Sequence, residues 1–300
     1  MIAPPFLKMG DTIAIVSTAR KISKEEIQPA LDLIQDWGLK CVLGSTIGAE
    51  EHQFAGSDQI RAMDMQLMLD DPNIKAIWCA RGGYGTVRFI DRLDFSEFEK
   101  KPKWIVGYSD VTVLHSHIHQ KNIETIHAQM PLEIEKRTKQ TSESLRSILF
   151  GEHQEIEIET EYDLNRTGMA SGLLVGGNLS ILYSLCGSES SISTKSKILF
   201  IEDLDEYLYH IDRMIYNLKR NSMLNDLAGI IVGGMSQMND NTIPFGKQAE
   251  QIIFDAVSEY NYPVCFQFPA GHIHDNRAMI LGRKANLIVD NMSVRLQFNP

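Results

Sequence analysis

The sequence of 300 residues has few of the features that mark metal-binding, disulfide-stabilised or membrane proteins. Its four cysteines, Cys41, Cys79, Cys186 and Cys265, stand singly in apolar segments, which is typical of buried reduced thiols and not of zinc or disulfide spacing. No window approaches the ~18 apolar residues of a membrane span, and the N-terminus lacks a basic segment followed by an apolar one. We therefore expect a cytoplasmic protein without a structural metal or a cofactor.

Runs of like charge are also missing, and the formal net charge is -10. Both observations argue against nucleic acid or an anionic membrane surface as the main partner. The glycine-rich stretch at 81–85 matches neither the dinucleotide fingerprint nor a P-loop, so a nucleotide site is weakly supported. A hydrophobic content of 43% with 23% charged residues instead indicates a globular protein with mass enough for two domains.

Short β-branched runs alternate with amphipathic stretches through the first half of the chain. Because such alternation is typical of a parallel sheet covered on both faces, we expect an α/β domain over residues 1–150. In the helix at 57–69, Met63, Leu67 and Met68 are expected to pack in the core. The pattern predicts strands at 12–17, 40–43, 74–79 and 103–106 and helices at 23–37, 57–69, 84–93 and 111–120.

The pattern changes near residue 150. Charged and apolar residues alternate at 155–160, which favours a half-exposed strand, and we place a linker at 151–168 before a second domain at 169–300. That domain ends in a run of predicted strands. Its predicted strands are 197–201, 229–232, 263–266, 278–281, 285–289 and 293–298, and its predicted helices are 211–218 and 247–258.

The segment from Trp104 to Leu114 is an apolar strand that breaks at Gly107 and restarts as a helix after Ser109-Asp110. A serine on a sharp strand-to-helix turn exposes its hydroxyl, and the free N–H groups of the new helix point beside it. This is a position suited to a nucleophile. The alternative is that Ser109 or Asp110 is an ordinary helix N-cap.

The glycine-rich Arg81-Gly-Gly-Tyr-Gly85 also follows a predicted strand. Its backbone N–H groups could cradle an anion, or Gly83 or a neighbour could contribute one N–H of an oxyanion hole, with Asp110 contributing the other. The alternative is a tight turn that needs positive φ.

Two further polar residues, Glu202 and His272, stand just past predicted strands. The chain order serine, acid, histidine is that of several serine hydrolases. A serine needs a base to take its proton, and a neutral imidazole needs a carboxylate to fix its tautomer. Neighbouring residues compete for the same roles, namely Asp203, Asp205, Glu206, His274 and Asp275.

Further motifs stand beside Arg81–Gly85 and Gly107–Asp110, namely Gly176–Ser180, Phe200–Asp203 with Tyr209–Arg213, and Pro269–His272. Taken together, these motifs resemble the LD-carboxypeptidase family of serine peptidases, which contains muramoyl-tetrapeptide carboxypeptidase and the microcin C immunity hydrolases. The resemblance implies a nucleophile at Ser109, a base at His272, an orienting acid at Glu202 and an oxyanion hole from the N–H groups of Gly83 and Asp110. It also implies a flavodoxin-like N-terminal domain, a smaller β-rich C-terminal domain and a homodimer.

The implied reaction removes the terminal D-alanine from the murein tetrapeptide in cell-wall recycling, so the expected partner is a small peptide. Such an exopeptidase needs a cation or a cluster of N–H groups for the free carboxylate. Arg81 is the candidate because arginine suits bidentate carboxylate recognition, although it could instead pair with a neighbouring carboxylate.

Three alternatives remain open. A peptidyl-nucleotide or aminoacyl-nucleotide hydrolase would need an aromatic side chain, such as Trp78 or Tyr84, to stack on the base. A non-catalytic two-domain protein that binds a small anion would not bring the serine, acid and histidine together. A conventional α/β-hydrolase fits less well, because Val111 replaces the second glycine of Gly-x-Ser-x-Gly.

Overall fold

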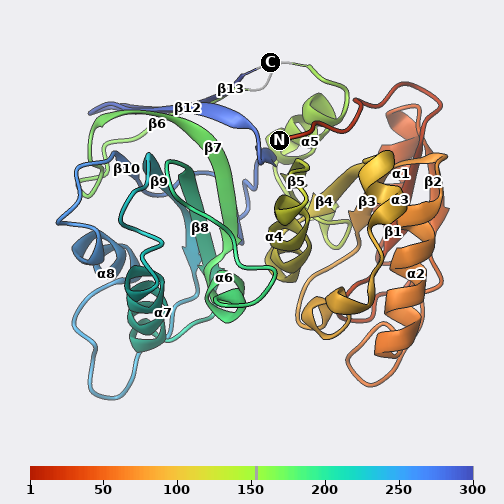
Figure 1. Cartoon of the computed structure of the whole chain (residues 1–300), viewed down its shortest axis with the longest axis horizontal. Coiled ribbons are helices and arrows are strands. Elements are labelled where there is room, and N and C mark those ends of the chain that lie inside the picture. The colour runs from red at the N-terminus through yellow and green to blue at the C-terminus, as the bar shows by residue number, and fades with distance from the viewer. Residues whose placement is uncertain (153–154, 300) are drawn as a thin grey trace. The chain divides into compact units, whose positions relative to one another are not determined.

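The computed structural model describes residues 1–152 and 155–299. The chain divides into two compact units, Met1–His153 with His274–Ile280, and Gln154–Ile273 with Leu281–Pro300. Each unit contains one sheet (Figure 1). The first sheet has six strands and the second has seven. The predicted α/β class, with a parallel-sheet N-terminal part and a β-rich C-terminal part, is confirmed.

The first sheet has the strand order β11-β5-β4-β3-β1-β2. Its first five strands in the chain pair in parallel in the order 2-1-3-4-5, which is flavodoxin-like. The strands are β1 (Thr12–Val16), β2 (Lys40–Leu43), β3 (Ile74–Cys79), β4 (Trp104–Gly107), β5 (Thr125–His127) and β11 (Met279–Leu281). The helices are α1 (Gln28–Asp36), α2 (Asp58–Asp70), α3 (Ser96–Lys100), α4 (Thr112–Gln120) and α5 (Lys139–Leu149).

Two local predictions for this unit are wrong. The helix predicted at 84–93 is instead a pair of short 3-10 turns, η1 (Thr86–Arg88) and η2 (Ile90–Arg92), because Gly83 and Gly85 at the start of the segment adopt positive φ. In α2, Met63 and Leu67 are 58% and 64% exposed. The apolar residues of this helix are spread around its axis, so the pattern alone does not fix which face is buried.

The first helix also begins later than the sequence predicts. Ser23 and Glu26 form a capping box, since the Glu26 carboxylate accepts from the Ser23 N–H at 2.8 Å and the Ser23 hydroxyl accepts from the Glu26 N–H at 3.2 Å. The helix nevertheless begins only at Gln28. The capping box therefore orders a turn just before the helix.

The second sheet has the order β10-β9-β8-β7-β12-β13-β6. Four of its strands, from β7 to β10, pair in parallel, and the remainder pair antiparallel. The strands are β6 (Glu155–Glu159), β7 (Gly168–Asn178), β8 (Ile198–Leu204), β9 (Gly229–Ser236), β10 (Val264–Cys265), β12 (Lys284–Val289) and β13 (Ser293–Phe298). The helices are α6 (Leu179–Leu185), α7 (Leu208–Arg220) and α8 (Ala249–Ala256).

Two segments differ in role from the predicted domain layout. The predicted linker at 151–168 includes β6, which pairs with β13 as an edge strand of the second sheet. The segment His274–Ile280 belongs to the first unit, because β11 joins the first sheet beside β5. Both placements depend on pairing between segments far apart in the sequence.

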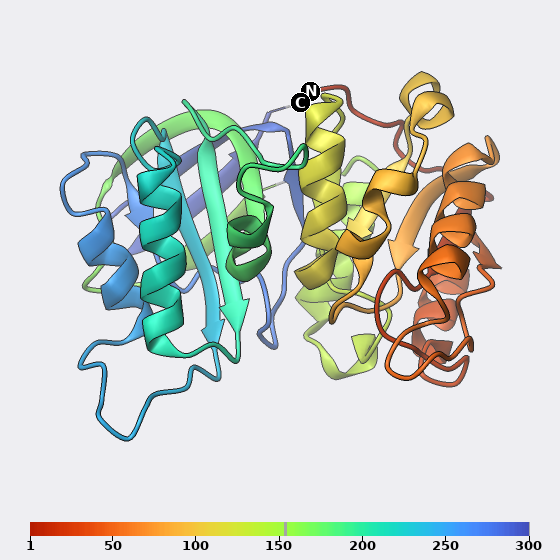
Figure 2. The same cartoon turned by 60° about the horizontal axis from the view of Figure 1, so that its bottom comes forward.

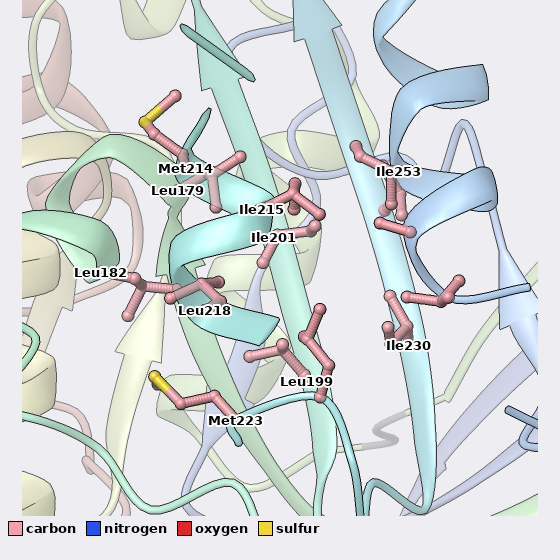
Figure 3. Packing of buried hydrophobic residues seen from close by; sticks show 14 of the residues in the cluster. Leu179, Leu182, Leu199, Ile201, Met214, Ile215, Leu218, Met223, Ile230 and Ile253 are labelled. Atoms are coloured by element: carbon pink, nitrogen blue, oxygen red, sulfur yellow. The ribbon is translucent and has the colours of Figure 1, made fainter. Parts of the chain in front are cut away.

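The helices α6, α7 and α8 cover one face of the parallel strands of the second unit (Figure 2). Their apolar sides meet side chains of β8 and β9, as the packing of Ile201, Ile215, Ile230 and Ile253 shows (Figure 3). On α7 the buried residues recur at helical spacing, which makes one apolar stripe. This packing fixes β8, the strand that carries Glu202.

The four cysteines differ in how deeply they are buried. Cys79 and Cys265 are buried, and burial raises the pKa of each thiol to about 12. Cys41 and Cys186 are only half-buried, so the expectation of full burial is wrong for them. All four are free thiols.

The described residues contain neither a membrane-spanning helix nor a cluster of metal-binding side chains. No helix there has both the length and the apolar character needed to cross a lipid bilayer. In the same residues, no three or more histidine, cysteine, aspartate or glutamate side chains are grouped so that they could hold a metal ion.

Candidate active site

Ser109 stands at the sharp turn between β4 and α4. Tyr108 is extended (φ -150°, ψ -171°), and Ser109 then adopts a left-handed φ of 63° before the 3-10 turn η3 (Ser109–Val111). Positive φ is uncommon and strained for a residue with a side chain, and such strain clusters at functional sites. Neither Ser109 nor Asp110 is the N-cap of η3 or of α4, so the capping alternative is wrong.

His115, in the first turn of α4, holds the strand-to-helix turn at Ser109 in place. Its Nε2 lies 2.9 Å from the Gly107 carbonyl oxygen, and because a carbonyl only accepts, Nε2 carries the proton. The ring is fully buried, and burial lowers the pKa of His115 to about 4. The imidazole is therefore neutral. Sequence reasoning missed this residue, because a histidine inside a helix gives no signal of its partner.

The Asp110 side chain ties the serine turn to the glycine-rich turn. Its carboxylate is buried, and Oδ2 accepts a hydrogen bond from the Thr86 N–H at 2.9 Å. Burial raises the pKa of Asp110, and the hydrogen bonds from Thr86 and Gly85 oppose that rise. In the described part of the chain, the N–H groups of Gly83 and Asp110 donate to no backbone carbonyl. Both are thus available to an oxyanion.

Gly82 is in direct contact with the serine. A Cβ built on Gly82 would lie 2.9 Å from both Cβ and Oγ of Ser109, so only glycine leaves room for the hydroxyl. Since β3 and β4 are neighbours in the sheet, the turns that follow them share its carboxyl edge, where α/β proteins bind ligands. Sequence reasoning assigned Gly83 and missed Gly82.

Arg81 opens the same turn. Its Nη1 donates to the Lys21 carbonyl at 3.0 Å, and its buried Nε has no hydrogen-bond partner among the described residues. Burial lowers the pKa of Arg81, Glu26 raises it, and the positive charge of Arg20 lowers it again. Arg81 is therefore anchored at one nitrogen and unsatisfied at another.

Glu202 and His272 are in contact within the second unit. Oε2 of Glu202 lies 2.7 Å from Nδ1 of His272 and also accepts the His272 backbone N–H at 3.1 Å. The glutamate side chain is fully buried, whereas the histidine side chain is 15% exposed. A carboxylate on Nδ1 holds that nitrogen protonated and leaves Nε2 able to accept a proton.

Gly271 makes this contact possible. Its φ is 103°, and a Cβ built on it would lie 2.6 Å from Oε2 of Glu202. The backbone before His272 therefore passes directly over the carboxylate. Ser236 fixes the other side, because its hydroxyl donates to the His272 carbonyl at 2.8 Å.

The glycine-rich stretch at 176–180 supports the carboxylate of Glu202. Asn178 Nδ2 donates to Asp203 Oδ1 at 2.9 Å and lies 3.3 Å from Glu202 Oε1. Asp203, the competitor for the role of acid, accepts the Ser180 N–H at 2.9 Å. Burial and the neighbouring Glu202 raise the pKa of Asp203 to about 7. Asp203 is thus bonded to the start of α6 and not to His272.

The candidate residues form two sets, one in each unit. Ser109, Asp110 and the turn 81–83 lie in the first unit, and Glu202 and His272 lie in the second. Within its unit, each set has the local geometry of part of a serine hydrolase site: a strained serine beside N–H donors, and an imidazole paired with a carboxylate.

Comparison with known proteins gives matches along most of the chain. Residues 13–128 match the LD-carboxypeptidase N-terminal domain, and residues 171–287 match the LD-carboxypeptidase C-terminal domain. A probable murein peptide carboxypeptidase of Bacillus subtilis is 34% identical over 296 residues, covering 94% of this chain and 90% of the relative. A murein tetrapeptide carboxypeptidase of Pseudomonas aeruginosa is 26% identical, covering 92% of each chain.

Among solved structures, muramoyltetrapeptide carboxypeptidase from Oxalobacter formigenes has the same fold. The TM-score is 0.86 at 23% sequence identity, with 96% of this chain and 99% of that chain covered.

Proposed function

Because this chain belongs to the LD-carboxypeptidase family of serine hydrolases, we propose that it removes the terminal D-alanine from the murein tetrapeptide through an acyl-enzyme on Ser109. The relative from Pseudomonas aeruginosa, whose name specifies the tetrapeptide, supports this substrate. The observation that carries the proposal is the 2.7 Å contact between Glu202 and Nδ1 of His272, since it prepares the imidazole as a base.

In the proposed first step, Nε2 of His272 takes the proton of the Ser109 hydroxyl while Oγ attacks the carbonyl carbon before the D-alanine. The new C–O bond places negative charge on the carbonyl oxygen. The N–H groups of Gly83 and Asp110 hold that charge, and one such donor typically lowers the barrier by ~3 kcal/mol. Glu202 stabilises the imidazolium and remains ionised.

In the second step, His272 gives its proton to the nitrogen of the departing D-alanine as the C–N bond breaks. A water molecule then repeats the sequence on the ester, and Ser109 recovers its proton. Arg81 is proposed to attract the free carboxylate of the substrate, supported by its unsatisfied Nε beside the turn. The chemistry needs no group beyond these side chains and backbone donors.

The test is release of D-alanine from murein tetrapeptide by the wild type and by Ser109→Ala, with a peptidyl-adenylate tested alongside. Release by the wild type alone supports the proposal. Retained turnover in Ser109→Ala would show that Ser109 is not the nucleophile. Cleavage of the adenylate without D-alanine release would favour the nucleotide-hydrolase alternative, and inactivity on both would favour a binding protein.

The family resemblance also supports a homodimer acting in cytoplasmic cell-wall recycling. Sedimentation analysis of the purified chain tests the first part, and a monomer at the concentrations used for activity would contradict it. Accumulation of tetrapeptide in cells that lack this chain tests the second part.

A further inference from the structure

Arg20 extends across the glycine-rich turn. A Cβ built on Gly83 would lie 2.7 Å from Cγ and Cδ of Arg20 and 3.2 Å from its Nε. The absence of a side chain at 83 therefore lets the arginine stem lie against the backbone of the turn. The residue itself is exposed, which is how long cationic side chains pack their stems and keep the charged end in solvent.

The backbone around Arg20 is fixed. Its carbonyl accepts a hydrogen bond from the Ser17 hydroxyl at 2.6 Å, and its backbone forms an isolated antiparallel β-bridge with that of Phe54. The residue follows β1, which pairs with β3. Because β1, β3 and β4 are consecutive in the sheet, Arg20, the turn 82–83 and Ser109 lie in a row along its carboxyl edge.

The two sides of the turn face different side chains. Gly82 is against the Ser109 hydroxyl, and Gly83 is against Arg20. One residue step along the backbone thus separates the contact with the nucleophile from the contact with the cation.

Two cationic side chains are close together at this turn. Burial lowers the Arg81 pKa most, the negative charges of Glu26 and Glu133 raise it, and the positive charge of Arg20 lowers it. Arg81 also donates to the Lys21 carbonyl. Arg20, by contrast, takes part in none of the ion pairs found within residues 1–152 and 155–299. Two neighbouring guanidinium groups repel each other unless an anion binds between them.

The reaction places the free carboxylate of the substrate close to this turn. In a peptide that loses its last residue, only the amide nitrogen and one Cα separate the scissile carbonyl carbon from the carboxylate carbon, a span of about 4 Å. The carboxylate must therefore sit within one residue of the oxyanion donors. Gly83, proposed as one of those donors, is the residue that Arg20 contacts.

We propose that Arg20 binds the free carboxylate of the departing D-alanine, together with Arg81, and so restricts the enzyme to the last residue of its substrate. This assignment rests on the proposed function. The planar guanidinium supplies two parallel N–H donors for the two carboxylate oxygens. The carboxylate also relieves the repulsion between the two arginines.

The test compares the wild type, Arg20→Met and Arg20→Lys on murein tetrapeptide and on the same peptide with a C-terminal amide. Arg20→Met should lower kcat/KM on the free acid by about 10- to 100-fold, the range for losing a hydrogen bond to a charged group, mainly through KM. Its rate on the amide should stay close to that of the wild type. Arg20→Lys should recover part of the loss. Lys24→Met, which removes an exposed cation four residues further along, is the matched control and should change neither rate.

The outcomes separate the two proposals. If the wild type releases D-alanine and Arg20→Met keeps its preference for the acid, the Arg20 assignment is overturned and the proposed function stands. Loss of preference in Arg81→Met alone would also overturn it. An equal loss on acid and amide would show that Arg20 only supports the turn. If the wild type releases no D-alanine, the proposed function fails first.

Discussion

The carboxylate of Asp110 accepts a hydrogen bond from the Thr86 N–H at 2.9 Å, so the residue after Ser109 is tied to the turn that follows β3. The two proposed oxyanion donors belong to these two turns. Their spacing therefore depends on a side chain that does not contact the substrate.

Replacing that side chain should reduce turnover more than substrate binding. Asp110→Ala leaves the Thr86 N–H without its partner, which costs about 1–3 kcal/mol when the group is buried, and frees the glycine-rich turn to move. We expect kcat to fall by at least tenfold with a smaller change in KM. Asp110→Asn retains an acceptor oxygen and should restore most of kcat. Equal kcat values for Asp110→Ala and the wild type would contradict the positioning role.

Gly82→Ala should block the nucleophile directly. Its new Cβ would meet Ser109 Oγ at 2.9 Å, so either the hydroxyl or the turn must shift. Labelling by a serine-directed fluorophosphonate measures the effect, and we expect its rate to fall toward that of Ser109→Ala. The thermal unfolding midpoint is the control, since a large drop there would show loss of fold instead. Labelling at the wild-type rate would show that the turn has room for a side chain.

Glu202→Gln should lower kcat strongly without unfolding the protein. The amide cannot stabilise an imidazolium or fix the same tautomer, and comparable changes in serine hydrolases cost on the order of 10⁴ in kcat. Asp203→Asn is the matched comparison, because Asp203 bonds to the Ser180 N–H and to Asn178 and not to His272. We expect it to reduce stability more than kcat. The reverse pattern would transfer the role of acid to Asp203.

His115 should make the stability of the first unit depend on pH. Its folded pKa of about 4 is below the unfolded value near 6.5, so the unfolded chain binds more protons in between. The stabilisation that neutral His115 contributes to the folded state is complete above pH 6.5 and is lost as the pH falls toward 4. Between pH 7 and pH 5 the loss is about 2 kcal/mol. Denaturant unfolding of the wild type and of His115→Gln at both pH values measures this, and the variant should show a smaller decrease. Equal decreases would assign the dependence to other groups.

The sequence predicts most strands and the serine turn because their signals are local. Gly107, Ser109 and the apolar run before them lie within six residues, and β1 and β3 are compact apolar runs. The short strand β5 (Thr125–His127) was not predicted. Glu202 and His272 could be proposed from their positions after strands. Their contact could not, because it joins residues 70 positions apart.

The features that sequence reasoning missed all depend on distant neighbours. Gly82 matters only because β3 and β4 are adjacent, and Arg20 only because β1 is adjacent to β3. The segment that carries β11 lies near the end of the chain yet completes the first sheet. On α2, Met63 and Leu67 face solvent because Met65 and Met68 face the core, a choice that packing makes.

Gly271 gives the Glu202 and His272 pair a consequence for protein engineering. The carboxylate receives both the ring and the backbone N–H of one histidine, and the residue before it has no space for a side chain. A substitution at position 202, 271 or 272 therefore disturbs the contacts of the other two, so the three positions should be kept together. Libraries aimed at new C-terminal leaving groups would hold these three codons fixed and randomise the residues around positions 20 and 81.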